Sequence, residues 1–210
     1  MPQAQQRPVP KDKKRRRRRR AASVVVFAFT TLLLAWFLES RATTTIIFVR
    51  HADTDTTMAE GGDPPLNARG KARAELLADF LQDVDVVAGV DAIYASEFKR
   101  TQQTAAPLAQ RLNLEIEIAD PYDVVGFTQS LLKKHKGEIV LVVSHGDAIA
   151  PLIEELHGSK KLPEMGKDDF DNLYIVSSPW FGRVKTLRMH YAVGWRPPDV
   201  PEPPYDGKPR

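Results

Sequence analysis

At 210 residues the chain has the length of one globular domain with appended segments, and it contains no cysteine, which excludes disulfide bonds and thiolate metal sites. Its formal net charge of +3 is misleading, because residues 1–20 hold ten of the 30 Lys and Arg residues and only one acid. Residues 21–210 hold 20 basic against 26 acidic residues, a net of −6. We therefore expect no nucleic-acid partner for the folded part.

The N-terminal region combines a basic segment with an apolar one. Residues 1–20 are polar, contain prolines and end in six consecutive arginines, so we expect a disordered cytoplasmic segment. Residues 21–38 carry no charge, and as a helix they would span roughly 27 Å, close to the hydrocarbon thickness of a bilayer. We predict a transmembrane signal-anchor helix over residues 21–40. The positive-inside rule places the N-terminus in the cytoplasm and the following domain in a periplasmic or other extracytoplasmic space.

Two other interpretations of this region stay open. Residues 40–42, Ser-Arg-Ala, resemble a small-x-small cleavage site, so the apolar segment could be a cleaved signal peptide, although it is long for one. The arginines could instead form a nuclear-localisation or nucleic-acid-binding arm, which the adjoining apolar segment disfavours. Anchoring and cleavage both place the domain outside the cytoplasm.

From residue 42 onward, segments typical of strands alternate with segments typical of helices. Strand patterns lie near residues 46–49, 91–96, 114–118, 138–143, 173–176 and 184–191. Helix patterns cover residues 67–81, where Asn67 is a plausible N-cap, and residues 100–112, 127–136 and 147–156. This alternation predicts a three-layer α/β/α domain with a mainly parallel central sheet over residues 42–193. Residues 194–210 hold six prolines and predict a disordered tail that a partner protein could bind.

Two of the strand patterns end in histidine beside residues suited to bind an anion. Residues 46–49 run into Arg50-His51, residues 138–143 run into Ser144-His145, and Arg100 follows the strand that ends at Ser96. Because the carboxyl ends of parallel strands lie at one edge of a sheet, we expect the two arginines and two histidines to converge there. Guanidinium groups pair with phosphoryl oxygens, and an imidazole kept neutral by nearby cations can attack phosphorus. His51 is our candidate nucleophile.

Four motifs in this order resemble the histidine phosphatase superfamily, whose fold is phosphoglycerate mutase-like. They are Arg50-His51-Ala52 with Thr54, Pro65-Leu66-Asn67-x-x-Gly70, Ile93-Tyr94-Ala95-Ser96-x-x-x-Arg100-Thr101-x-x-Thr104-Ala105, and Ser144-His145-Gly146. The resemblance covers roughly residues 44–191. It implies that His51 accepts the phosphoryl group as a covalent phosphohistidine, which water then hydrolyses without a metal or other cofactor. It also implies that Arg50, Arg100 and His145 hold the phosphoryl oxygens.

The same resemblance indicates where this chain departs from the family. Thr54, Thr57 and Ser96 are candidate substrate-binding residues, and Thr57 stands where the family often has asparagine. The family often supplies a glutamate as general acid after the second strand, where this chain offers aspartates. Asp123 is our first candidate for this acid, and Asp147, two residues after His145, is the second.

The spacing of the motifs bears on the substrate. Only 44 residues, from Thr101 to Ser144, separate the second arginine from the second histidine motif, and the expected strands and helices fill them. Family members with mutase activity or narrow specificity usually have a longer capping insertion here. The short spacing therefore disfavours a mutase and predicts an open site for a bulky or varied substrate, either a phosphorylated small molecule or an envelope component.

The sequence thus predicts a membrane-tethered, metal-independent phosphatase that hydrolyses phosphomonoesters or phosphoramidates. Two alternatives stay open. The first is a catalytically weak phosphatase-like module that binds a phosphorylated ligand or protein partner. The second is a metallophosphatase whose ligands would be His51, Asp53, Asp55, His145 and Asp147.

Overall fold

The computed structural model describes residues 12–40, 43–55, 62–82 and 89–196. The chain divides into two compact units, residues 1–40 and residues 41–210, and each is described by itself.

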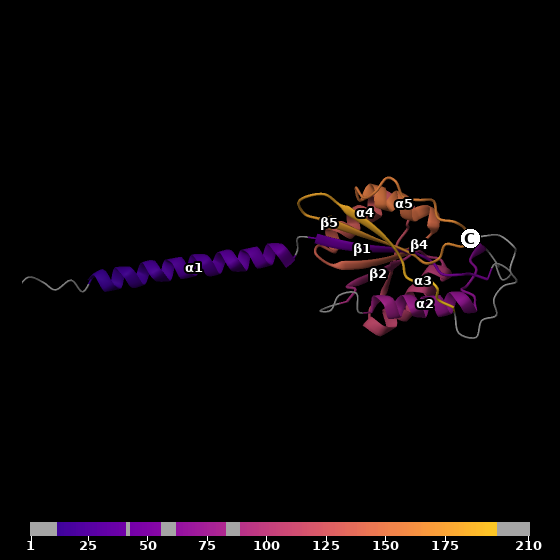
Figure 1. Cartoon of the computed structure of the whole chain (residues 1–210), viewed down its shortest axis with the longest axis horizontal. Coiled ribbons are helices and arrows are strands. Elements are labelled where there is room, and N and C mark those ends of the chain that lie inside the picture. Colours follow the sequence, from indigo (N-terminus) through magenta and orange to yellow (C-terminus); the bar gives the residue numbers. More distant parts are fainter. Residues whose placement is uncertain (1–11, 41–42, 56–61, 83–88, 197–210) are drawn as a thin grey trace, which may run out of the picture. The chain divides into compact units, whose positions relative to one another are not determined.

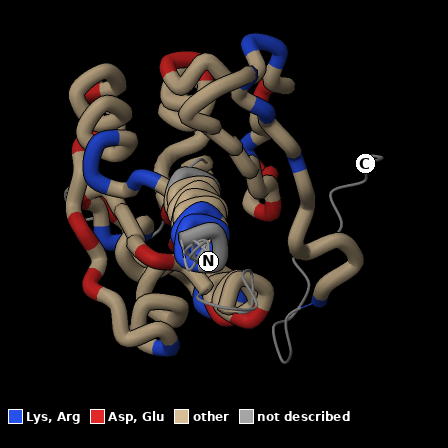
Figure 2. The backbone as a smooth tube through the Cα atoms, turned by 90° about the vertical axis from the view of Figure 1, so that its left-hand side faces the viewer, with Lys and Arg blue, Asp and Glu red and all other residues tan. Residues whose placement is uncertain are grey.

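The first unit contains a single described helix, α1 (Asp12–Ser40), with its Lys and Arg residues gathered toward its N-terminal end (Figure 2). Within it, the segment Arg15–Phe37 has the length and composition needed to cross a membrane, a test that a signal sequence also passes. The helix begins earlier than expected, because residues 12–20 are helical rather than disordered. Lys and Arg have high helix propensity and can extend a helix that the apolar segment nucleates. The rest of the expected disordered segment, residues 1–11, lies outside the described residues.

The second unit is built on a six-stranded sheet (Figure 1). Its strands are β1 (Thr43–Arg50), β2 (Ala92–Ala95), β3 (Ile116–Ile118), β4 (Ile139–Ser144), β5 (Asn172–Pro179) and β6 (Lys185–His190). They follow the order β3-β2-β4-β1-β5-β6. The pairs from β3 to β1 are parallel, whereas β5 is antiparallel to both β1 and β6. The expected mainly parallel sheet is confirmed, with an antiparallel edge.

Helices cover both faces of this sheet. They are α2 (Ala68–Leu81), α3 (Lys99–Leu112), α4 (Val124–Lys134) and α5 (Gly146–Glu155). One buried cluster joins Ile46 and Phe48 of β1 to α4 and α5, and the other joins Ile47 and Val49 to α2 and α3 (Figure 1). Successive residues of β1 thus point into opposite cores, which explains the continuous apolar run in its sequence. The predicted three-layer α/β/α fold is confirmed.

The motif Pro65–Gly70 fixes the loop that follows β1. As expected, Asn67 caps α2, with its Oδ1 atom accepting a hydrogen bond from the Gly70 amide at 2.8 Å. The Asn67 amide donates to the Asp53 carbonyl at 3.1 Å. A side chain at Gly70 would collide with that same carbonyl, so only glycine allows this close approach. The motif therefore holds the chain just after His51 against the start of α2.

The end of the domain differs from the expected unpacked tail. Residues 191–194 form a turn, and the Trp195 ring lies over the Arg73 guanidinium, with the Arg73 Cζ atom 5.4 Å from the ring centroid. Packing therefore continues to Trp195, past the expected boundary at residue 193. The proline-rich residues 197–210 lie outside the described residues.

Candidate active site

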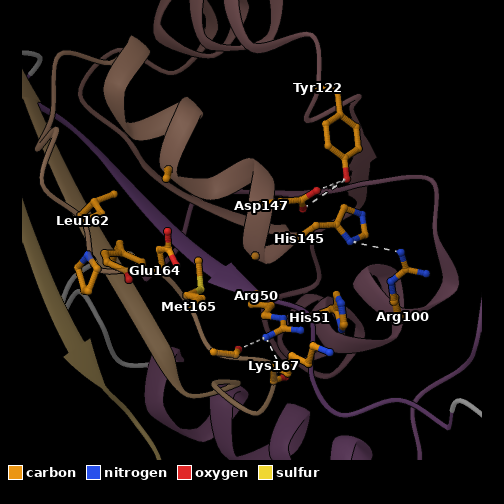
Figure 3. A pocket seen from close by; sticks show the side chains of 15 residues that line it. Arg50, His51, Arg100, Tyr122, His145, Asp147, Leu162, Glu164, Met165 and Lys167 are labelled. Carbon is orange, nitrogen blue, oxygen red and sulfur yellow. Dashed lines mark hydrogen bonds between the residues drawn. The ribbon is translucent and has the colours of Figure 1, made fainter.

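A cavity of about 630 Å³ lies at the carboxyl ends of β1 and β4 (Figure 3). Arg50 and His51 reach it from the end of β1, Arg100 from the first turn of α3, and His145 from the residue before α5. The parallel register pairs Arg50 with Ser144, and the His51 amide donates to the Ser144 carbonyl at 2.9 Å. This pairing brings the two histidine motifs together as expected, with the two imidazole centroids 5.6 Å apart.

The hydrogen bonding of His51 determines its tautomer. Its Nδ1 atom lies 2.8 Å from the carbonyl oxygen of Ala52, which can only accept a hydrogen bond. Nδ1 therefore carries the proton, and Nε2 carries the lone pair. Burial, together with the positive charges of Arg50 and Arg100, lowers the pKa of His51 to about 4. The ring is neutral at pH 7, which is the state that a nucleophile requires.

The tautomer of His145 follows from a chain of hydroxyl groups behind it. Its Nδ1 atom faces Nη2 of Arg100 at 3.5 Å, and arginine can only donate, so the proton sits on Nε2. Nε2 donates to Ser96 Oγ at 2.9 Å, which donates to Thr101 Oγ1 at 2.8 Å. Thr101 completes the chain by donating to the Phe98 carbonyl at 2.7 Å. Burial and the charge of Arg100 lower the pKa of His145 to about 4.

Neither of the two expected substrate-binding residues that the structure describes, Thr54 and Ser96, lines the cavity. Ser96 is buried behind His145 and orients its imidazole, and it does not line the cavity. Thr54 forms an isolated β-bridge with Leu66 and does not line the cavity either. Thr57 lies outside the described residues. The Ser96 hydroxyl therefore supports the second histidine, and the Thr54 backbone helps to fix the loop.

The two candidate acids have different positions. Asp123 caps α4 by accepting from the Gly126 amide at 3.1 Å and does not line the cavity, so its position does not support the expectation that it is the general acid. Asp147 lines the cavity from the first turn of α5 and accepts a hydrogen bond from the Tyr122 hydroxyl at 3.3 Å (Figure 3). Of the two candidates, Asp147 is therefore the carboxyl group that lies at the cavity.

Our sequence analysis overlooked Tyr122. Its ring is stacked on His145 with an interplanar angle of 4°, and burial and the Asp147 carboxylate raise its pKa. The residue lies beside Asp123 in the segment that we searched only for carboxylates. A search of that segment for every side chain that can carry a proton would have found Tyr122.

The sequence analysis also missed the wall formed by residues 162–167, between α5 and β5, which has no sequence signal. Leu162, Pro163 and Met165 give this wall an apolar surface beside the charged groups of Glu164 and Lys167. Arg50 holds the wall in place, because its Nη1 atom donates to the carbonyls of Gly166 at 2.9 Å and Lys167 at 3.1 Å.

Asp53 bears on the metallophosphatase alternative. Its carboxylate is buried and accepts a hydrogen bond from Arg73 Nε at 2.6 Å, with Arg69 Nε 3.5 Å away. This ion pair removes Asp53 from the proposed ligand set. Among the residues that the structure describes, no group of three or more His, Asp or Glu side chains could hold a metal ion.

Comparison with protein families agrees with this geometry. The family model described as "Histidine phosphatase superfamily (branch 1)" matches residues 46–121, which include Arg50, His51 and Arg100. The match covers 76 of the 210 residues, so this segment is similar to that superfamily. The chain is 32% identical to phosphoserine phosphatase 1 of Hydrogenobacter thermophilus over 123 residues, which cover 57% of the chain and 47% of that protein. It is 40% identical to the uncharacterized protein Rv0525 of Mycobacterium tuberculosis over 82 residues, which cover 37% of this chain and 38% of that protein. The chain thus spans less than half the length of the curated relatives it matches.

Solved structures share the fold. The protein histidine phosphatase SixA, complexed with tungstate, superimposes with a TM-score of 0.56 at 24% identity, covering 70% of this chain and 97% of that one. The mycobacterial glucosyl-3-phosphoglycerate phosphatase Rv2419c gives a TM-score of 0.53 at 18% identity, and the match covers 70% of this chain and 98% of that one. At these identities the likeness establishes the fold alone.

The buried neutral histidines predict that stability depends on pH. The folded chain holds His51 and His145 unprotonated down to a pKa of about 4, whereas the unfolded chain binds those protons near pH 6.5. The unfolded state therefore binds more protons between these values, and stability falls as the pH falls. Lowering the pH from 7 to 5 is expected to reduce the free energy of unfolding by about 3 kcal/mol through these two groups.

Urea unfolding of the full chain in a mild detergent at both pH values measures this dependence. The matched control is the double variant His51→Gln, His145→Gln, in which most of the difference is expected to disappear. A difference of the same size in the double variant would show that other groups cause it.

Proposed function

We propose that the chain is a phosphatase that hydrolyses phosphomonoesters or phosphoramidates through a covalent phosphohistidine on His51. The observation that carries this proposal is the state of the His51 ring, which is neutral with Nδ1 bound to a carbonyl and Nε2 left with its lone pair. The ring lines a cavity that also contains Arg50, Arg100 and His145. Such a cationic, partly buried set favours a phosphoryl group.

The residues suit two successive displacements. In the first, Nε2 of His51 attacks phosphorus as the bond to the leaving group breaks, and Asp147 transfers a proton to that group. Arg100 and Arg50 offset the charge on the phosphoryl oxygens. The negative charge of a bound phosphoryl group would also favour a second proton on His145, at Nδ1, which could then donate to these oxygens. In the second step, water gives a proton to the Asp147 carboxylate and attacks the phosphohistidine. This step releases inorganic phosphate and restores neutral His51.

We further propose that the segment Arg15–Phe37 tethers the domain to a membrane as a single-pass anchor, with the N-terminus in the cytoplasm and the catalytic domain outside it. The length and apolar composition of the segment support a span. The basic residues gathered at the amino-terminal end of α1, ahead of the uncharged residues 21–38, support the orientation.

The phosphatase activity is expected to survive removal of metal ions, because Arg50 and Arg100 supply the positive charge at the phosphoryl site. Hydrolysis of p-nitrophenyl phosphate by the full chain in detergent should proceed at the same rate with excess EDTA. Loss of activity in EDTA and its return with a divalent metal would support the metallophosphatase instead. Tight binding of phosphate without any turnover would support the binding module.

The Asp147→Asn variant is expected to distinguish substrates by their leaving groups. An alkyl phosphate needs a proton at the departing oxygen, so its kcat/KM should fall about 100-fold or more. p-Nitrophenyl phosphate departs readily without that proton and should be affected much less. The comparison requires kcat/KM for both substrates.

The Asp123→Ala variant is the matched control for Asp147. It is expected to leave the ratio of the two substrates unchanged and to lower the free energy of unfolding by about 1 kcal/mol through loss of the α4 cap. A substrate-dependent loss in Asp123→Ala, with none in Asp147→Asn, would reverse the assignment.

A further inference from the structure

The turn between β5 and β6 presents two large aromatic side chains to solvent. Trp180 is 83% exposed and Phe181 is 92% exposed, and both lie at the tip of the turn. Two exposed cations, Arg183 and Lys185, follow within four residues of Phe181. Adjacent exposed aromatic residues are unusual on a surface that faces only water. Aromatic rings next to Lys and Arg are typical of segments that sit at the boundary between lipid and water.

The sheet places this turn at the end of the domain where the chain arrives from α1. Thr43, the first residue of β1, pairs with Pro179, the residue before Trp180. Thr43 is only six residues after Phe37, the last residue of the apolar segment, and an extended chain of that length reaches about 20 Å at most. If the apolar segment spans a bilayer, chain connectivity alone keeps the start of β1 close to its surface.

A third cation lies at the same end of the domain. Thr44 Oγ1 donates to the His135 carbonyl at 3.0 Å and accepts from the Gly137 amide at 3.1 Å, which fixes the turn carrying exposed Lys136 beside the start of β1. The nearby acid Glu138 pairs with His135 Nδ1 at 2.7 Å. The aromatic tip is therefore accompanied by cations that complement anionic lipid headgroups.

We propose that Trp180 and Phe181 insert into the interfacial region of the bilayer that α1 crosses, and so dock the domain on the membrane by the amino-terminal end of β1. The inference rests on the proposed membrane tether. A lipid surface is the expected partner, because the aromatic tip, its cations and the start of β1 lie at one end of the sheet.

This docking constrains the substrate. The cavity lies at the other end of β1, where Arg50 is seven residues beyond Thr43, a distance of roughly 23 Å along the strand. A domain docked by its Trp180 end presents the cavity away from the bilayer. The substrate class that this arrangement favours is a phosphoryl group on a soluble molecule or on a protein, rather than a headgroup of the anchoring membrane.

The three tryptophans of the chain allow a direct test with native side chains. Three full-chain proteins, each keeping one of Trp36, Trp180 and Trp195 and carrying phenylalanine at the other two positions, are reconstituted in vesicles of phosphatidylcholine and phosphatidylglycerol. Quenching of tryptophan emission by brominated acyl chains is then measured. We expect at least about twofold quenching of Trp36 and Trp180, because interfacial aromatic residues reach the acyl boundary. Trp195, which packs on Arg73, should not be quenched.

The outcomes separate this inference from the proposals on which it rests. Quenching of Trp36 without quenching of Trp180 would overturn the docking and leave the tether intact. Absence of quenching at Trp36 would overturn the tether and the docking together. Hydrolysis of p-nitrophenyl phosphate by the same samples reports separately on the phosphatase. In vesicles that also contain phosphatidic acid, release of phosphate from this lipid would contradict the outward-facing cavity. Its absence beside active turnover of p-nitrophenyl phosphate is the expected result.

Discussion

Replacement of His51 by alanine is expected to reduce p-nitrophenyl phosphate hydrolysis by at least about a thousandfold, as removal of a covalent nucleophile does in other enzymes. The variant keeps Arg50, Arg100 and His145 in the cavity, so binding of inorganic phosphate should persist while turnover is lost. Steady-state rates and a phosphate-binding titration on the full chain measure the two properties separately.

The matched control is His190→Ala. His190 is exposed on β6, lies 3.0 Å from Asp171 and does not line the cavity, so its removal should leave the rate unchanged. A His51→Ala protein that turns over at a rate close to that of the unmodified chain would show that phosphorus is attacked by another group or directly by water.

The Asp53→Asn variant is expected to lower the free energy of unfolding by about 3 kcal/mol, the largest stability effect in the domain that we predict. Asp53 and Arg73 are both buried, and their side chains are joined at 2.6 Å. An amide can keep the hydrogen bond but cannot balance the buried guanidinium charge, for which the nearby Trp195 ring and Tyr191 side chain compensate only in part. Urea unfolding of the full chain in detergent measures the loss.

A surface ion pair supplies the comparison. Glu75 lies 2.8 Å from Arg111 with most of its side chain in solvent, and exposed pairs of this kind contribute about 0.5 kcal/mol or less. The Glu75→Gln variant should therefore be almost as stable as the unmodified chain. Equal losses of unfolding free energy in Asp53→Asn and Glu75→Gln would mean that burial does not strengthen the ion pair between Asp53 and Arg73.

The parts of the fold that the sequence predicts well are those with a strong local pattern. The apolar β-branched run of β1 and the run of β4 are buried on both faces, and Asn67 sits where the helical spacing begins. The convergence of His51 and His145 follows from the same patterns, because parallel strands bring their carboxyl ends to one edge.

The position of Asp123 depended on a helix boundary that the sequence did not predict. The spacing of apolar residues placed the start of α4 at residue 127, whereas the helix begins at Val124. This shift of three residues makes Asp123 a helix cap, with its carboxylate accepting from the Gly126 amide and not lining the cavity. The distance in sequence from the histidine motif could not distinguish Asp123 from Asp147. Which of the two lines the cavity depends on the direction in which each carboxylate points.

The cavity wall could not be predicted for a different reason. Residues 162–167 have neither helical nor strand periodicity, and their position depends on contacts between Arg50 and backbone carbonyls about 116 residues away in the chain. Ser96 likewise has the residue type of a phosphate ligand, but its place in the hydrogen-bond chain behind His145 is a property of the packed structure.

The most direct test of the phosphohistidine is to denature the full chain during turnover of a radiolabelled phosphomonoester and to map the label by peptide. The account predicts label on the peptide that contains His51, stable to alkali and lost in acid, and absent from the His51→Ala variant. Label on another residue, or rapid turnover with no labelled protein at any stage, would contradict it.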